Sequence, residues 1–242
     1  GQLWGNPLYD WNAMARDGYR WWAARLKRQL SQVDLIRLDH FRGFAAAWHV
    51  KAGESTAKSG TWVDGPRENL FSRLRSDLGG LPIIAEDLGL ITEDVHDLRE
   101  RFGFPGMRVL QFALGGPDNP YWPHNYDPNT VAYTGTHDND TTVGWWATLS
   151  EVDRTRVGAY VGHTVTEPHW ELIRMAWASV AVVAITPLQD ILGLGGEARM
   201  NVPGVAAGNW GWRFSPDQFQ AGIVERLTEW TVRYNRVPAA TP

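Results

Sequence analysis

VDLIRLDH, residues 33–40, is the stretch that decides the fold of this 242-residue chain. It opens as a short run of mainly aliphatic residues, which is typical of a strand buried on both faces of a parallel sheet. It then ends in Asp39 and His40, and Asp39 comes two residues after Arg37. The stretch therefore predicts a buried strand, Val33–Leu38, whose carboxyl end carries polar chemistry.

Four more runs of the same kind follow along the chain. They are Leu81–Ala85, Arg108–Phe112, Val131–Thr134 and Ala181–Thr186. Apolar residues at helical spacing lie around and between these runs. They predict helices over Asp10–Leu30, over Pro66–Leu78, from the cap Thr92 to Phe102, and from the cap Ser215 to Tyr234. Strands that alternate with helices in this way predict βα units and a parallel sheet.

Polar residues follow the predicted strands and favour a barrel over an open sheet. They are Arg37, Asp39 and His40, then Glu86 and Asp87, then His137 and Asp138, then Gln189 and Asp190. Reactive groups gathered from the carboxyl ends of several strands are typical of a (β/α)8 TIM barrel. Five strands are predicted, and the 32 residues before the first are too few for three more βα units.

We therefore expect residues 1–242 to form one incomplete α/β barrel, about strands 4 to 8 with their helices. The chain then represents the C-terminal half of a longer protein, without the N-terminal strands and subdomains of that barrel. An open barrel exposes two sheet edges and leaves its interior unfilled. The polypeptide alone is expected to be unstable, aggregated or inactive.

Composition and charge exclude several function classes. With 23 basic and 27 acidic residues the net charge is −4, so nucleic acid is not an expected partner. The absence of cysteine excludes disulfides and thiolate metal sites, and the spacing of the seven histidines predicts no metal or other cofactor. The apolar runs are too short for a membrane span, and no signal segment opens the chain, which predicts a cytoplasmic location. Fourteen tryptophans favour a carbohydrate ligand, because flat aromatic rings stack on sugars.

Three acids, Asp39, Glu86 and Asp138, each come just after an apolar run. Two carboxylates that face each other across a sugar break a glycosidic bond: one donates a proton and the other attacks or activates water. The third then binds the substrate. A single acid at a strand end is more often a helix cap or an ion-pair partner, so each one alone leaves both interpretations open.

Neighbouring residues support the catalytic interpretation. Strand alternation places Arg37 and Asp39 on the same side, where the guanidinium holds the carboxylate ionised. His137 offers a donor for a sugar hydroxyl, although a loop histidine without a catalytic role is an alternative. The apolar residues before Glu86 favour its desolvation, which a proton donor needs at neutral pH.

Seven segments together resemble the 4-α-glucanotransferases, also called amylomaltases or disproportionating enzymes, of glycoside hydrolase family 77 in the α-amylase clan. They are GQLWGNPLYDW (1–11), DLIRLDHFRGF (34–44), PIIAEDLGLIT (82–92), GFPGMRVLQFA (103–113), YTGTHDNDTTVGWW (133–146), PLQDILGLG (187–195), and RMNVPG (199–204) with GNWGWR (208–213). They occur in the family's order along nearly the whole chain. The resemblance to the wider clan rests on fewer residues.

The resemblance implies a retaining transfer of α-1,4-glucan segments from a donor maltodextrin to the 4-hydroxyl of glucose, maltose or another glucan, as in starch and glycogen metabolism. It implies these roles: Asp39 as nucleophile, Glu86 as general acid/base, Asp138 as transition-state stabiliser, Arg37 and His137 as sugar contacts, and Trp4, Phe112 and Asn201 as further substrate-binding residues. Retention requires the two reacting carboxyl groups to lie about 5–5.5 Å apart. Two alternatives are an α-amylase-type hydrolase and a non-catalytic glucan-binding fragment. The oligomeric state is left open.

Overall fold

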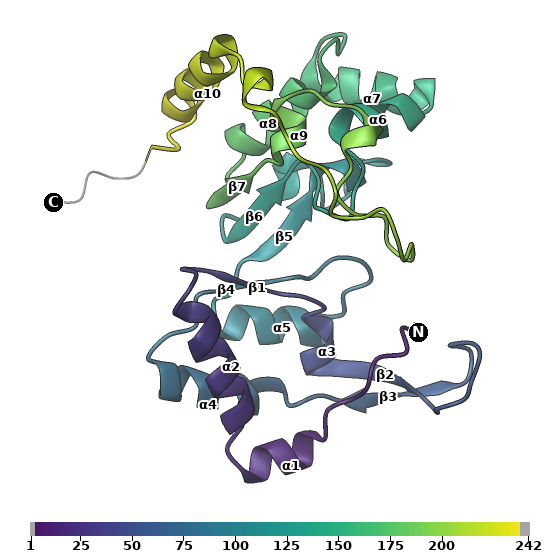
Figure 1. The fold of residues 1–242 in the computed structure, drawn as a ribbon, viewed down its shortest axis with the longest axis vertical. Coiled ribbons are helices and arrows are strands. Elements are labelled where there is room, and N and C mark those ends of the chain that lie inside the picture. Colours follow the sequence, from purple (N-terminus) through teal and green to yellow (C-terminus); the bar gives the residue numbers. More distant parts are fainter. Residues whose placement is uncertain (1–2, 238–242) are drawn as a thin grey trace, which may run out of the picture. The chain divides into compact units, whose positions relative to one another are not determined.

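The computed structural model describes residues 3–237, and Figure 1 shows a mixed α/β chain. It divides into two compact units, residues 1–107 (unit 1) and residues 108–242 (unit 2). The first two residues of the predicted motif 1–11 lie outside the described residues. No helix within residues 3–237 is long and apolar enough to span a membrane.

Short strands occur at all five predicted positions. They are β1 (Ile36–Leu38), β4 (Ile83–Ala85), β5 (Gly106–Val109), β6 (Thr130–Tyr133) and β7 (Val183–Ile185). β1 pairs in parallel with β4, with Arg37 opposite Ile84. β6 pairs in parallel with β7, and β5, in which the boundary between the units falls, is the other neighbour of β6. The parallel arrangement predicted from the sequence is confirmed for these pairs.

Burial of the strands agrees with the prediction for β4 and β6, whose residues are all buried. β7 differs, because Ile185 is 39% exposed. Within residues 3–237 β7 is an edge strand with a partner on one side only. The aliphatic character of β7 is therefore not explained by contacts inside unit 2.

Unit 1 packs its helices around an aromatic core. The helices are α1 (Trp11–Arg16), α2 (Arg20–Leu30), α3 (Arg42–Ala45), α4 (Arg67–Leu78) and α5 (Glu93–Arg101). Phe71 on α4 is fully buried, and its ring centroid lies 5.2–5.5 Å from the centroids of Phe41, Phe44 and Phe104. Large rings that are buried together contribute much of the hydrophobic stabilisation of a small unit.

The helix predicted over residues 10–30 is broken into α1 and α2. Gly18 adopts φ +71°, and its N–H bonds to the Ala15 carbonyl while the Tyr19 N–H bonds to the Met14 carbonyl. This pair of bonds is a Schellman motif, which ends a helix at a left-handed glycine. The periodicity of the apolar residues continues through the break, which is why the sequence predicted one helix.

An antiparallel hairpin in unit 1 was not predicted. β2 (Ala46–Val50) pairs with β3 (Gly60–Asp64), with Trp48 opposite Trp62. Figure 1 shows the hairpin extending away from the helices of unit 1. Because it lies between β1 and α4, it is an insertion in the βα unit.

Unit 2 carries the remaining elements. They are η1 (Leu110–Phe112), η2 (Pro123–Asn125), α6 (Thr142–Thr148), α7 (Glu151–Val161), α8 (Pro168–Ala178), α9 (Leu188–Ile191), η3 (Gly196–Ala198), η4 (Pro216–Gln218) and α10 (Ala221–Arg233). Its core joins buried residues of η1, β6, α7 and α8, among them Leu110, Ala132, Val157 and Leu172.

Several predicted boundaries were wrong. The buried strand predicted over residues 33–38 begins only at Ile36, and Val33 and Leu35 before it are 48% and 44% exposed. The strand predicted over residues 108–112 starts two residues earlier and passes into η1. The last helix is split, because Ser215 and Gln218 close a capping box around the short turn η4 before α10 begins.

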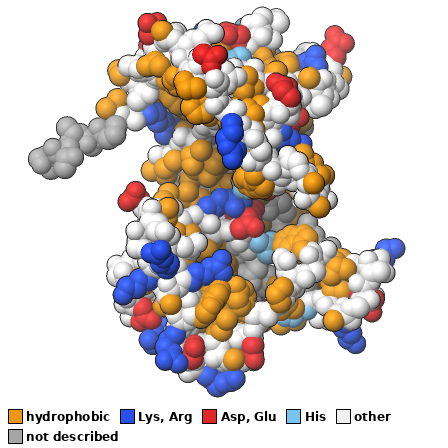
Figure 2. All heavy atoms as spheres, viewed as in Figure 1, with side chains coloured by type: hydrophobic (Ala, Val, Ile, Leu, Met, Phe, Trp, Pro, Cys, Tyr) orange, Lys and Arg blue, Asp and Glu red, His pale blue; other side chains and the backbone are white. Residues whose placement is uncertain are grey.

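Large apolar side chains also stay exposed on both units, as the orange areas of Figure 2 illustrate. They include Trp4, Trp21, Trp62, Val182, Trp210, Val224 and Val232.

Candidate active site

Arg37 and Asp39 form an ion pair at the end of β1. Arg37 Nη1 lies 2.8 Å from Asp39 Oδ1, and Arg37 Nε donates to Met107 Sδ at 3.3 Å. The Asp39 side chain is 78% exposed, so the carboxylate is open to a ligand. The pair therefore contributes little to stability, because exposed ion pairs are weak, but it orients the carboxylate. Its geometry agrees with the prediction from strand alternation.

Glu86 follows β4 and is fixed through both of its carboxylate oxygens. The backbone N–H of His40 donates to Oε2 at 2.7 Å, and the N–H of Leu88 donates to Oε1 at 2.9 Å. The side chain is half-buried. Two backbone N–H donors suit an ionised carboxylate, which accepts hydrogen bonds only.

His40 joins the two strand ends in unit 1. Its φ of +48° lies in the left-handed region, which is uncommon for a residue other than glycine. His40 directly follows Asp39 in the chain, and in this conformation its backbone N–H points toward Glu86. Backbone strain of this kind persists where the surroundings over-determine it, often at functional sites.

Trp4 is brought to the same place. Its ring centroid lies 4.7 Å from the His40 ring centroid, with the planes at 75°. Trp4 is 57% exposed, so most of the indole surface is free to contact a ligand. Unit 1 therefore gathers four predicted residues, Arg37, Asp39, Glu86 and Trp4, around His40.

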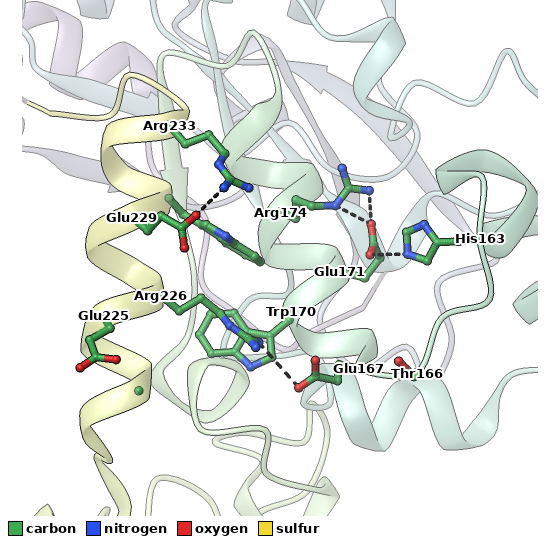
Figure 3. Close-up of a pocket in the computed structure, with 12 residues that line it drawn as sticks. His163, Thr166, Glu167, Trp170, Glu171, Arg174, Glu225, Arg226, Glu229 and Arg233 are labelled. Carbon is green, nitrogen blue, oxygen red and sulfur yellow. Dashed lines mark hydrogen bonds and ion pairs between the residues drawn. The ribbon is translucent and has the colours of Figure 1, made fainter.

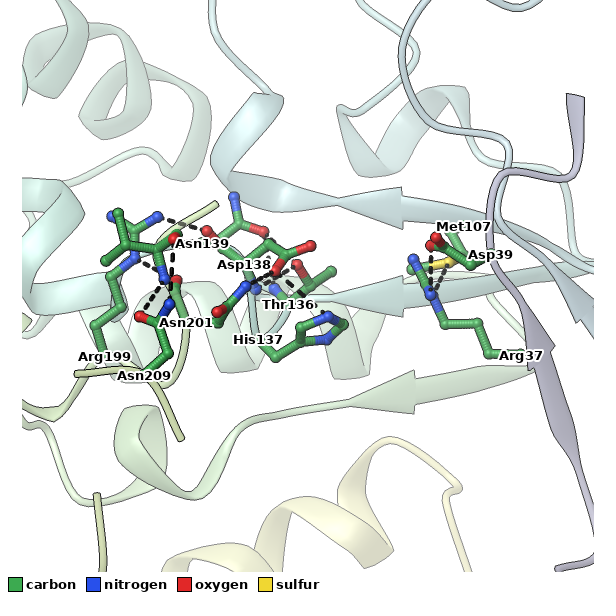
Figure 4. Close-up of polar contacts among 11 residues, drawn as sticks. Arg37, Asp39, Met107, Thr136, His137, Asp138, Asn139, Arg199, Asn201 and Asn209 are labelled. Carbon is green, nitrogen blue, oxygen red and sulfur yellow. Dashed lines mark hydrogen bonds and ion pairs between the residues drawn. The ribbon is translucent and has the colours of Figure 1, made fainter. Parts of the chain in front are cut away.

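Unit 2 gathers a second group on the loop that follows β6 (Figure 4). His137 Nε2 lies 3.4 Å from Asp138 Oδ1, and Asn201 Nδ2 donates to the same oxygen at 2.6 Å. Arg199 Nη2 donates to the Asp138 carbonyl at 2.6 Å. The structure thus brings together His137, Asp138 and Asn201, three of the predicted residues.

Trp210 is a neighbour of this group that was not among the predicted site residues. Its ring centroid lies 5.3 Å from that of His137, and Trp210 is 54% exposed. It belongs to the motif GNWGWR, but nothing in the local pattern distinguishes it from Trp212. Its backbone has φ +62°, which only the structure reveals.

Phe112 lies elsewhere in unit 2, at the end of η1. Its ring packs edge-on against Tyr121, with the centroids 5.3 Å apart, and Phe112 is 41% exposed. Its predicted contact with substrate stays a prediction.

A separate hollow of about 540 Å³ lies between α8 and α10 in unit 2. Most of its charged side chains pair with one another, as Figure 3 shows: Glu171 with His163 and Arg174, Arg226 with Glu167, and Arg233 with Glu229. The Arg226 guanidinium also lies 4.5 Å from the centroid of the Trp170 ring. Most of the charged side chains of the hollow are therefore held in ion pairs, and Glu225 lines the hollow outside these pairs.

No group of three or more His, Asp or Glu side chains in the described part of the chain is placed to hold a metal ion. A reaction without a metal or other cofactor stays a prediction. The chemistry that both groups offer is that of carboxylates: two on paired strand ends of unit 1, and one beside an imidazole and an amide in unit 2.

Comparison with known proteins supplies the family. The family model described as 4-alpha-glucanotransferase matches residues 1–219. This chain belongs to the 4-α-glucanotransferase family. The 4-alpha-glucanotransferase of Synechocystis sp. is 52% identical over 240 residues, which are 98% of this chain and 48% of that protein. The enzyme of Clostridium butyricum is 46% identical over 239 residues, 98% of this chain and 49% of the relative.

Relatives of known structure and location agree with this family. The solved structure of an amylomaltase from Streptococcus agalactiae in complex with acarbose superposes with a TM-score of 0.91 at 36% identity, covering 97% of this chain and 48% of that one. The chain therefore spans about half the length of the 4-α-glucanotransferases that it matches. A chloroplastic/amyloplastic relative from Arabidopsis thaliana is 51% identical over 215 residues, 88% of this chain and 37% of the relative, so a cytoplasmic location stays a prediction.

Proposed function

We propose that this chain carries the catalytic carboxylates of a retaining 4-α-glucanotransferase, with Asp39 as nucleophile, Glu86 as general acid/base and Asp138 as transition-state stabiliser. The observation that carries the proposal is the hydrogen bond from the His40 N–H to Glu86. It ties the carboxyl of Glu86 to the residue next to Asp39. This link supports a pair of neighbouring carboxyl groups, and a retaining mechanism requires them to lie about 5–5.5 Å apart.

In the first step, a protonated Glu86 donates its proton to the glycosidic oxygen of an α-1,4-glucan. The bond between the anomeric carbon and that oxygen breaks as Asp39 Oδ attacks the carbon from the opposite face. The product is a β-linked glucanyl ester on Asp39, and the part of the donor beyond the cleaved bond leaves with the proton from Glu86. Arg37 orients Asp39 for the attack, because Arg37 Nη1 lies 2.8 Å from Asp39 Oδ1.

In the second step, the 4-hydroxyl of glucose, maltose or another glucan attacks the ester. Glu86, now ionised, removes the proton of that hydroxyl and is returned to its starting state. The N–H bonds from His40 and Leu88 suit the ionised form and so stabilise the base of this step. Each step inverts the configuration of the anomeric carbon, so the two steps together retain it. A new α-1,4 bond replaces the one that was broken.

Asp138 is proposed to face the cationic sugar of both transition states. His137 and Asn201 hold its Oδ1, which leaves Oδ2 for the substrate. The ring of His137 and the exposed face of Trp210 add contacts to sugar hydroxyls and to the sugar ring. Trp4 contributes a further aromatic surface beside His40.

We further infer that the five strands belong to a (β/α)8 barrel, as strands 4 to 8 of a catalytic domain that includes residues 1–242. The strand order and the single-sided pairing of β7 support this inference. The similarity over 97% of this chain to about half of the amylomaltase structure supports it as well. Barrel closure pairs the first strand with the last, which gives the free edge of β7 a partner.

Two other functions make different predictions. An α-amylase-type hydrolase transfers the glucanyl group to water, so it gives glucose and maltose without longer products. A glucan-binding fragment binds glucan and turns nothing over. Both are less well supported, since the matched relatives are named as transferases and a binding module has no use for a carboxylate after each of three strands.

The test is incubation of the full-length protein that carries residues 1–242 with maltotriose, with glucose and longer maltodextrins followed together. A transferase yields glucose with maltopentaose and longer chains, and Asp39→Asn yields neither. Glucose and maltose alone indicate the hydrolase. Binding that is equal in wild type and Asp39→Asn, with no turnover in either, indicates the binding fragment.

A further inference from the structure

A buried carboxylate of unit 2 has no part in the proposed chemistry. Asp190 lies on α9, a few residues after β7, and is 1% exposed. It accepts three hydrogen bonds: from Thr134 Oγ1 at 2.5 Å, from the Thr142 N–H at 2.7 Å and from Thr142 Oγ1 at 2.8 Å. Burial of a carboxylate is energetically unfavourable, and the three hydrogen bonds offset this cost.

The two threonines are the ends of the loop that carries the group in unit 2. Thr134 follows β6 directly, and Thr142 is the first residue of α6. Both are fully buried. One carboxylate therefore holds the start and the end of the loop 135–141, which contains His137 and Asp138.

The interior of the loop is held from other sides. Gln111 Nε2 donates to the Asp140 carbonyl at 2.9 Å, and a Cβ at Gly135 would lie 2.7 Å from the same Gln111 nitrogen. Arg199 binds the Asp138 carbonyl. These contacts fix points along the loop, whereas Asp190 fixes the separation of its ends.

The charge of Asp190 matters for this role. An ionised carboxylate accepts from all three donors at once, with Oδ1 taking the Thr142 N–H and Oδ2 taking both hydroxyls. An asparagine in the same position offers one acceptor oxygen, so it leaves donors of buried threonines without an acceptor. Charge-assisted bonds are also the stronger kind, and a fully satisfied buried network specifies a single arrangement.

We propose that Asp190 is a positioning residue that clamps both ends of the loop 135–141 and so fixes the place of Asp138. The clamp itself stands on the contacts of Asp190. Its effect on catalysis rests on the function proposed above for Asp138.

The first test is hydrogen exchange in the full-length protein that carries residues 1–242. In Asp190→Asn, we expect amides in a peptide covering residues 135–142 to exchange about tenfold faster or more, while the peptide of α7 (Glu151–Val161) is unchanged. Asp153→Asn, a carboxylate on α7 bonded to Ser150 and Arg156, is the matched control and leaves the loop unchanged. Equal exchange in the loop, or a rise across all of unit 2, overturns the clamp.

The second test is kinetic and separates positioning from a loss of folded protein. Misplacement of a group that acts on the transition state reduces kcat, by up to about a hundredfold for about 1 Å. We expect Asp190→Asn to lower kcat on maltotriose at least tenfold, with KM within threefold of wild type. A kcat that is unchanged in protein with a loosened loop overturns the catalytic part of the proposal.

Two further variants keep the proposal testable if Asp190→Asn does not fold. Thr134→Val and Thr142→Val each delete one hydroxyl donor at one end of the loop. Each is expected to speed exchange in residues 135–142 less than Asp190→Asn, and no change in either variant overturns the clamp. If the wild-type protein has no activity on maltotriose, the proposed function has failed, and hydrogen exchange alone decides on the clamp.

Discussion

Asp39 and Glu86 end neighbouring strands of unit 1 in different surroundings, and these surroundings fit different roles. Asp39 is 78% exposed and has one cationic partner. Glu86 is half-buried and accepts two backbone N–H bonds. A nucleophile needs an open, ionised carboxylate, whereas an acid/base must change its proton twice in each cycle without moving far.

Trp4 leads to a prediction about the choice between sugar and water as acceptor. An exposed indole beside His40 favours a bound glucan and displaces water from the site. In Trp4→Ala, we expect hydrolysis to rise relative to transfer about three- to tenfold, which corresponds to about 0.7–1.4 kcal/mol of aromatic contact. The ratio of glucose released to maltopentaose formed measures this.

Trp21→Ala is the control, because Trp21 is also exposed but packs with Tyr9 and Trp22. An unchanged product ratio in Trp4→Ala removes Trp4 from the acceptor site. An equal change in both variants assigns the effect to unit 1 as a whole.

Asp190 leads to a prediction about pH and stability. Burial raises the pKa of its carboxyl above 3.8, although the bonds from Thr134 and Thr142 oppose this. The folded protein therefore holds a proton that the unfolded chain has released, between pH 3.8 and the raised value. The contribution of Asp190 to the free energy of unfolding therefore falls as the pH rises through this range, because this group binds fewer protons in the unfolded state.

Asp190→Asn lacks this titration. Its free energy of unfolding relative to wild type is expected to rise with pH over the same range, measured by urea unfolding at several pH values. A difference that is constant with pH, or that falls, contradicts the assignment of the raised pKa to Asp190.

Residues of the site differ in how far the sequence predicts them. The pairing of Arg37 with Asp39 follows from strand alternation alone. Asn201 and Asp138, which are in contact, lie 63 positions apart in the sequence, so the local sequence pattern cannot predict this contact. The positions of Trp210 and His40 in the site follow from left-handed backbone conformations, which the residue types at these positions do not predict.

At the scale of elements, the aromatic core of unit 1 holds α4 against the strands. Phe71→Ala on α4 is expected to cost about 3–5 kcal/mol of unfolding free energy, because it removes a fully buried ring and leaves a cavity. Denaturant unfolding measures this cost. Leu90→Ala, at a side chain that is 87% exposed, is the control and is expected to change stability by less than about 0.5 kcal/mol. Similar costs for both variants contradict this description of the core.

The last helix, α10, buries none of its own residues and depends on a few anchors. Just after it, the guanidinium of Arg236 donates to the carbonyls of Trp177, Ser179 and Ala181 at 3.0, 2.9 and 2.6 Å. These carbonyls lie at and beyond the end of α8. We expect Arg236→Gln to loosen α10 by about 1–3 kcal/mol, seen as faster hydrogen exchange in residues 221–233.

Arg233→Gln provides the comparison. Arg233 pairs with Glu229 one turn away on the surface of α10, and such pairs are worth about 0.3–0.5 kcal/mol. If the two variants loosen α10 equally, the carbonyl contacts of Arg236 are not its anchor.

Elements were predicted where one local signal dominates. The five strands were found because each is a short aliphatic run between turn signals. The break at Gly18 was missed because the apolar period continues across it. The hairpin β2–β3 was missed because its two short strands are separated by the long, mainly polar stretch 51–59 and not by a short turn. These misses follow from competition between a local pattern and backbone geometry.

At the scale of the whole molecule, the residues proposed for catalysis occur in both compact units. Asp39 and Glu86 belong to unit 1, while His137 and Asp138 belong to unit 2. A single family model matches residues 1–219, which include the residues proposed for catalysis in both units.

The covalent intermediate on Asp39 tests the central claim most directly. With α-maltosyl fluoride as donor, the fluoride leaves without acid assistance, so Glu86→Gln in the full-length protein is expected to form the maltosyl ester and to hydrolyse it slowly. After acid quenching and digestion, mass spectrometry should find one maltosyl group added to the peptide that contains Asp39, and none in the double variant Asp39→Asn, Glu86→Gln. A maltosyl group on a different residue, or none at all while the wild type still disproportionates maltotriose, contradicts Asp39 as the nucleophile.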